Sequence, residues 1–74
     1  MRALLDYKGE VFGYLRGTTL YTLNDEETGK LTAEYVVDLA GNPVWRVYGD
    51  GVYSLDGFLP IGYFGPEMPP EYEI

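Results

Sequence analysis

Apolar and polar residues alternate in short stretches along this chain, and a glycine interrupts the alternation every few residues. In Leu5-Asp6-Tyr7, Val37-Asp38-Leu39 and Tyr53-Ser54-Leu55, one polar residue stands between two apolar ones. Such period-two alternation is typical of a strand with one buried face. Nowhere is the spacing of an apolar helix face sustained, and frequent glycine disfavours helix. The pattern predicts an all-β protein of short strands with no substantial helix.

The pattern also repeats with a period of sixteen residues. In rows of sixteen from Leu4, four columns are apolar in every row, where roughly 0.7 would be expected by chance. The columns are Leu4, Leu20, Val36 and Val52; Leu5, Tyr21, Val37 and Tyr53; Tyr7, Leu23, Leu39 and Leu55; and Leu15, Leu31, Val47 and Tyr63. A lone hairpin is marginally stable, so the last three columns are predicted to face a shared centre. The first column is predicted to lie at the joints between hairpins or against a partner chain.

Glycines mark two turns in most rows, because glycine supplies the positive φ that tight turns need. The predicted turn glycines are Gly9, Gly17, Gly41, Gly49, Gly57 and Gly65. Row two departs from the pattern, and its residues 24–30 are predicted to form a longer acidic loop. We therefore expect one domain over residues 1–65, built from four hairpin units of about sixteen residues in a pseudo-fourfold, flower-like arrangement. The units span about 4–19, 20–35, 36–51 and 52–67, and a Pro/Glu-rich tail follows over residues 66–74.

Several of the repeated motifs match a known family. They are Leu5-Asp6-Tyr7-Lys8-Gly9, Gly13-Tyr14-Leu15, Leu20-Tyr21-Thr22-Leu23, Val52-Tyr53-Ser54-Leu55-Asp56-Gly57 and Gly62-Tyr63. Through them, residues 4–65 resemble the bacterial 4-fold beta-flower proteins. The resemblance implies four β-hairpins arranged like petals. It implies no activity, because none is established for that family.

Composition narrows the chemistry. The 74 residues include no cysteine, no histidine and a single serine, so thiol, imidazole and Ser-His-Asp catalysis are excluded. We expect a protein that is not an enzyme and that has no cofactor or metal site. The net charge of −7 opposes direct nucleic-acid binding. No apolar run is long enough for a membrane span and no signal peptide is present, so a cytoplasmic location is the default expectation.

The acidic residues are predicted to have structural rather than catalytic roles. Asp25, Glu26 and Glu27 form a solvated loop tip, and that loop lacks the ligand spacing of a calcium site. Asp6 and Asp38 are predicted to face outward or to stabilise turns. In the tail, Pro-Pro-Glu-Tyr matches the ligand motif of WW domains, but a four-residue match often arises by chance, and we expect an acidic C-terminal extension that packs loosely or not at all.

The remaining aromatic residues suggest a contact surface. Trp45, Tyr14 and Tyr48 lie outside the apolar columns, and tryptophan, tyrosine and arginine supply most binding hot spots. The candidate contact surface comprises Tyr14, Trp45, Arg46, Tyr48, Asp25, Glu26 and Glu27. The leading hypothesis is a non-catalytic binding or assembly module that forms a homo-oligomer or engages a protein partner. The alternative is an acidic inhibitor or decoy of a nucleic-acid- or nucleotide-handling protein. A small-molecule ligand is not identified by the sequence.

Overall fold

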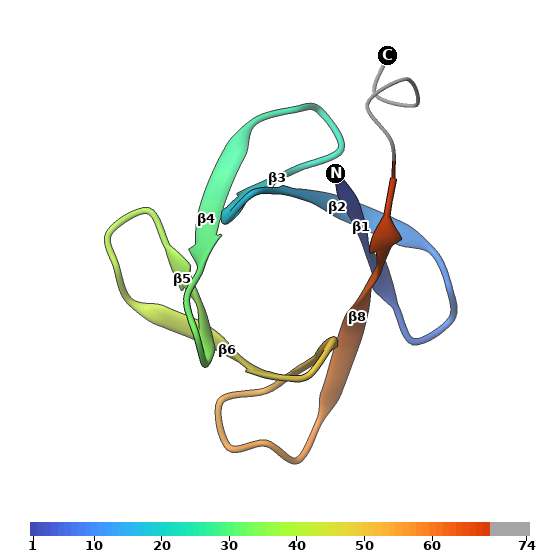
Figure 1. Ribbon diagram of the computed structural model, residues 1–74. Coiled ribbons are helices and arrows are strands. Elements are labelled where there is room, and N and C mark those ends of the chain that lie inside the picture. The colour runs from blue at the N-terminus through green and yellow to red at the C-terminus, as the bar shows by residue number, and fades with distance from the viewer. Residues whose placement is uncertain (69–74) are drawn as a thin grey trace.

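The computed structural model describes residues 1–68 and folds them into a closed β-barrel (Figure 1). Eight antiparallel strands follow one another in chain order, and β8 returns to pair with β1. The strands are β1 (Arg2–Asp6), β2 (Val11–Arg16), β3 (Thr19–Tyr21), β4 (Glu27–Leu31), β5 (Tyr35–Asp38), β6 (Pro43–Tyr48), β7 (Gly51–Tyr53) and β8 (Pro60–Glu67). The all-β prediction is confirmed, since no helix occurs among these 68 residues. The Pro-Pro-Glu-Tyr motif belongs to residues 69–74, outside the described residues.

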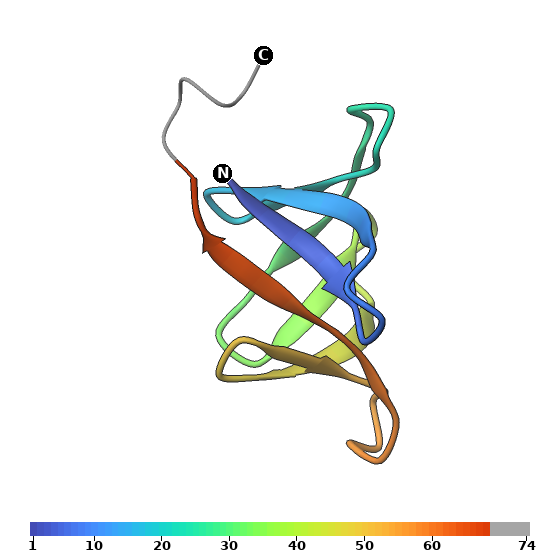
Figure 2. The ribbon, with the colours of Figure 1, turned by 90° about the vertical axis from the view of Figure 1, so that its right-hand side faces the viewer.

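The barrel closes where the two ends of the described chain meet. Figure 2 shows β1 and β8 side by side, crossing the barrel obliquely. The Met1 ammonium group binds the Glu67 carboxylate at 2.8 Å. Arg2 donates from Nε to the carbonyl oxygen of Gly65 and binds the Asp50 carboxylate at 2.8 Å. Full closure leaves no unpaired strand edge in the sheet, which removes the usual site of edge-to-edge aggregation.

The buried core contains the first apolar column, which we predicted to lie elsewhere. Among residues 1–68, six apolar side chains are buried: Leu4, Leu15, Leu20, Val36, Val52 and Phe64. The whole first column is among them, so its predicted position at hairpin joints or against a partner is wrong. The third column, with Tyr7, Leu23, Leu39 and Leu55, is exposed instead of facing the centre. In the last column, Tyr63 is exposed and Phe64 is buried in its place.

The prediction placed the wrong columns in the core, and the polar residue of each alternating triplet explains why. Asp6 Oδ1 accepts hydrogen bonds from the backbone N–H groups of Lys8 and Glu10, and Asp38 Oδ1 accepts from those of Ala40 and Asn42. These bonds satisfy each carboxylate within its own turn. The polar residue can therefore lie on the same face of its strand as the buried first-column residue two positions earlier. The predicted turn-stabilising role of both aspartates is confirmed.

The predicted turns are found with two exceptions, at Gly65 and at the acidic loop of residues 24–30. Gly9, Gly17, Gly41, Gly49 and Gly57 all have positive φ. Gly65 is no turn residue but lies buried within β8, because the chain continues there to pair with β1. The longer acidic loop predicted for residues 24–30 is also wrong. Thr22 N–H donates to the Glu26 carbonyl oxygen across a tight turn, Asp25 has a φ of 67°, and β4 begins at Glu27.

One extra residue interrupts the returning strand of every hairpin. Leu4 lies opposite Gly13, but the next residue, Leu5, lies opposite Val11, so Phe12 has no partner on β1. The same shift of register occurs between β3 and β4, β5 and β6, and β7 and β8. The unpaired residues are Phe12, Thr28, Val44 and Ile61. Such β-bulges bend a strand and redirect its side chains.

Candidate binding cavity

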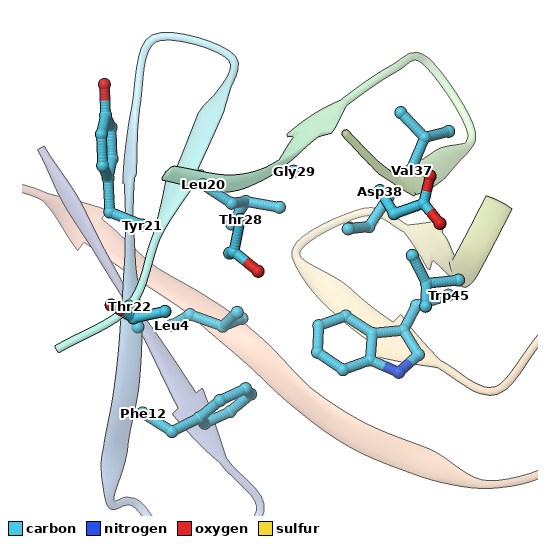
Figure 3. A pocket seen from close by; sticks show the side chains of 13 residues that line it. Leu4, Phe12, Leu20, Tyr21, Thr22, Thr28, Gly29, Val37, Asp38 and Trp45 are labelled. Atoms are coloured by element: carbon cyan, nitrogen blue, oxygen red, sulfur yellow. The ribbon is translucent and has the colours of Figure 1, made fainter. Parts of the chain in front are cut away.

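An apolar cavity of about 320 Å³ lies between the first three hairpins (Figure 3). Its lining comes from β1 to β6 and from Thr22, which directly follows β3. Figure 3 shows Phe12 and Trp45 along one side and Thr28 and Asp38 along the other. Three of the four bulged residues, Phe12, Thr28 and Val44, belong to the lining. The bulges therefore help to form the cavity wall.

Two glycines leave the space that the cavity occupies. Gly13 lies opposite Leu4, and Gly29 lies opposite Leu20, in the layer of buried leucines. A Cβ atom on Gly13 would come within 2.9 Å of the Tyr21 carbonyl oxygen. A Cβ atom on Gly29 would clash with the backbone carbonyl oxygen of Val37. The close approach of neighbouring strands thus requires glycine at these positions, and no side chain fills the space in front of them.

Trp45 occupies the corresponding position in the third hairpin. It lies opposite Val36, as Gly13 lies opposite Leu4. Its ring meets Phe12 edge to face, with centroids 6.1 Å apart and an interplanar angle of 82°. This perpendicular geometry is a favoured arrangement of aromatic pairs. The pair gives the cavity one rigid aromatic side.

The polar part of the lining is small. Tyr21, Thr22, Thr28 and Asp38 carry the side-chain oxygens of the lining, and Asp38 is its only charged residue among residues 1–68. The backbone N–H of Asn42, supported by that of Ala40, holds the pKa of the Asp38 carboxyl below its usual value of 3.8. Asp38 is therefore a fixed negative charge at neutral pH.

The aromatic and basic candidates of the predicted contact surface do not gather in one place. Trp45 faces the cavity, whereas Arg46 donates to the Tyr35 hydroxyl at 3.0 Å and lies over the Tyr35 ring. Tyr48, 82 % exposed, lies beside Arg46 at a separate small depression that includes Glu34. Tyr14 is half-buried in β2. The structure therefore divides this predicted surface between the cavity and the outer face of the barrel.

The three acidic candidates lie at the second hairpin. Asp25 forms an ion pair with Arg16 at 3.2 Å. Glu26 and Glu27 are exposed, the first in the turn and the second at the start of β4. None of the three lines the cavity.

Sequence reasoning missed Phe12, Thr28 and Asp38 as cavity residues. The bulges that redirect Phe12 and Thr28 depend on strand pairing, which the sequence does not display. One signal was present: Gly13, Gly29 and Trp45 stand sixteen residues apart. In such a column the two glycines leave space inside the barrel, and only the tryptophan side chain extends into it.

The hairpin tips carry a second apolar feature. The residue after each turn-stabilising side chain is exposed and apolar: Tyr7, Leu23, Leu39 and Leu55 are 45–71 % exposed. The tip of the fourth hairpin adds Phe58, 84 % exposed, and the neighbouring Leu59. In Figure 1 the four hairpin loops project outward from the central ring. The apolar tip residues thus lie on the periphery of the barrel.

No protein-family model, curated protein or solved structure matches this chain. Residues 1–68 contain no helix long and apolar enough to cross a membrane. The same residues contain no group of three or more carboxylate side chains that could hold a metal ion.

Proposed function

We propose that this protein is a small, non-catalytic assembly module that associates with further copies of itself through the apolar tips of its hairpins. The observation that carries the proposal is the exposed apolar residue at the same place in each tip, Tyr7, Leu23, Leu39 and Leu55. At the fourth tip Phe58 and Leu59 are exposed beside Leu55, and grouped exposed apolar side chains are a usual mark of an interaction site.

The tips are held in a defined shape, which favours binding. Thr22 Oγ1 accepts from the N–H groups of Asn24 and Glu26, in the manner of Asp6 and Asp38 in their turns. In the fourth tip, Ser54 Oγ accepts from the Leu59 N–H, and the Asp56 carboxylate accepts from the Phe58 N–H. A surface that is already ordered loses less conformational entropy on association.

The small core is a second reason to expect association. Only six apolar side chains are buried among the described residues, and neither disulfide nor metal adds stability there. Chains of this size commonly gain stability by oligomerising. Burial of the tip residues between copies would supply apolar contacts that the single barrel lacks.

We also propose that the chain consists of four copies of one hairpin unit in a pseudo-fourfold arrangement, as in the 4-fold beta-flower proteins that it resembles. Three features at corresponding positions support this. The turn acceptors are Asp6, Thr22, Asp38 and Ser54. The positive-φ residues are Gly9, Asp25, Gly41 and Gly57. The bulged residues are Phe12, Thr28, Val44 and Ile61. The alternative function, an acidic decoy, rests on the net charge of −7 alone.

The proposal is tested by light scattering on a sizing column at two widely separated concentrations. We expect the mass to exceed that of one chain and to rise with concentration. The double variant Phe58→Ser, Leu59→Ser should shift the mass toward the monomer. Tyr48→Ser is the matched control, because Tyr48 is equally exposed but lies in β6 and not at a tip. A monomer at both concentrations, or an equal effect of the control, would overturn the proposal.

A further inference from the structure

We propose that the cavity beside Phe12 and Trp45 binds a small organic ammonium ion with an apolar body. This goes beyond the assembly function and does not depend on it. The cavity residues belong to β1–β6 and Thr22, and none of the tip residues Tyr7, Leu23, Leu39 and Leu55 is among them.

The size and walls of the cavity set the body of the ligand. A volume of about 320 Å³ lies at the lower end of the range of small-molecule sites. Leu4, Leu20, Val36 and the Phe12–Trp45 pair provide apolar walls. A single ring or a branched alkyl group suits this space, whereas a nucleotide or an oligosaccharide would exceed it.

The charge of the lining sets the sign of the ligand. Within the described part of the chain, Asp38 is the only charged residue of the lining, and no lysine or arginine contributes to the wall. Hydrogen bonds from Ala40 N–H (3.0 Å) and Asn42 N–H (2.9 Å) hold its carboxylate in place. The Asn42 side chain and the Gly41 N–H also lower the pKa of Asp38, so the carboxyl stays ionised at neutral pH and attracts a cation by its charge. The net charge of −7 favours the approach of a cation and opposes that of an anion.

The aromatic rings supply a second attraction for a cation. The chain's three arginines already lie over other rings, with Arg2 over Phe64, Arg16 over Tyr21 and Arg46 over Tyr35, at 5.2–5.6 Å. Within residues 1–68, no such cation lies over Phe12 or Trp45. Tryptophan is the strongest cation–π partner among the side chains. An ammonium group between Asp38 and Trp45 would therefore gain both an ion pair and a ring contact.

Trp45 provides the assay, because it is the only tryptophan in the chain. We would titrate the whole protein at fixed ionic strength with benzyltrimethylammonium, with benzyl alcohol and with benzoate, following Trp45 fluorescence and the indole N–H resonance. We expect saturable binding of the cation, weaker binding of the neutral alcohol and none of the anion. Equal affinity for the cation and the alcohol would overturn the proposal.

Two aspartates with the same role in their turns allow a matched comparison. Asp38→Asn should weaken binding of the cation by about fivefold, the upper range for a solvent-exposed ion pair, and leave benzyl alcohol binding unchanged. Asp6→Asn is the control, since Asp6 makes the same pair of backbone hydrogen bonds but does not line the cavity. Thr28→Phe, which places a large side chain in the cavity and leaves both aspartates unchanged, should abolish the binding. Equal affinities in the two aspartate variants, or unchanged binding in Thr28→Phe, would refute the assignment.

Discussion

Gly29→Ala is predicted to destabilise the barrel strongly although it adds one methyl group. The new Cβ atom would clash with the backbone carbonyl oxygen of Val37 on the neighbouring strand. A backbone atom in a closed barrel cannot move aside without separating β4 from β5. Overpacking costs about 1–3 kcal/mol, and a lost ladder hydrogen bond adds about 1 kcal/mol. The lower entropy of the unfolded alanine chain returns about 0.4–1 kcal/mol. The free energy of unfolding should therefore fall by about 2–3 kcal/mol.

Urea denaturation followed by Trp45 fluorescence measures this change. In a chain of this size, a loss of 2–3 kcal/mol lowers the melting temperature by roughly 10–20 °C. Gly9→Ala is the control. Gly9 has a φ of 88° but no atom within 4 Å of an added Cβ, so only the cost of its backbone conformation, about 1 kcal/mol, applies. If Gly29→Ala were no more destabilising than Gly9→Ala, the close packing of β4 against β5 would be refuted.

Three further predictions follow from the core and the turns. Val52→Ala, at a side chain with no exposed surface, should lower the free energy of unfolding by about 2 kcal/mol, and a loss below about 0.5 kcal/mol would contradict its burial. Asp25→Gly should leave the melting temperature unchanged or raise it. Glycine adopts the positive φ of this position without strain, and this gain outweighs the loss of the exposed ion pair with Arg16. A clear loss of stability would show that the second turn differs from the others. The backbone N–H of Asn42 lowers the pKa of Asp38 in the folded state, so this stabilisation is present above about pH 4, the ordinary aspartate pKa, and is lost as the pH falls through the lower folded value. The melting temperature of Asp38→Asn should accordingly fall less than that of the unaltered protein between neutral and strongly acidic pH, and parallel pH profiles would refute this cause.

Local turn chemistry was predictable from the sequence, whereas the direction of the side chains was not. The turn positions of Gly9 and Gly41 followed from the conformational freedom of glycine, which needs no knowledge of distant residues. The alternation around Asp6 suggested that its apolar neighbours point inward. Asp6 is polar because it binds its own turn, and the neighbouring Tyr7 points to solvent. The alternation alone is compatible with either the apolar or the polar residues of a triplet lying on the core face of the strand. The local hydrogen bonds of the turn decide between the two.

The cavity depended on strand pairing and was therefore beyond sequence reasoning. Trp45 stood out in the sequence as an aromatic residue outside the apolar columns, but its contact with Phe12 depends on the bulge that redirects Phe12. The exchange of Tyr63 for Phe64 in the core has a similar origin. The fourth hairpin loop is one residue longer, so Val52 pairs with Gly62, ten residues away, whereas Leu4 pairs with Gly13, nine residues away. A fixed period of sixteen cannot represent that insertion.

The central claim is that the column containing Val52 faces the barrel interior while the hairpin-tip column faces solvent. Nuclear Overhauser contacts between assigned methyl groups test it most directly. We expect the Val52 methyls to contact other members of the buried cluster, Leu4, Leu20 and Val36. The methyls of Leu23 and Leu39 should show no contacts with that cluster. Contacts from Leu23 and Leu39 into the core, with Val52 methyls exposed to solvent, would contradict the account.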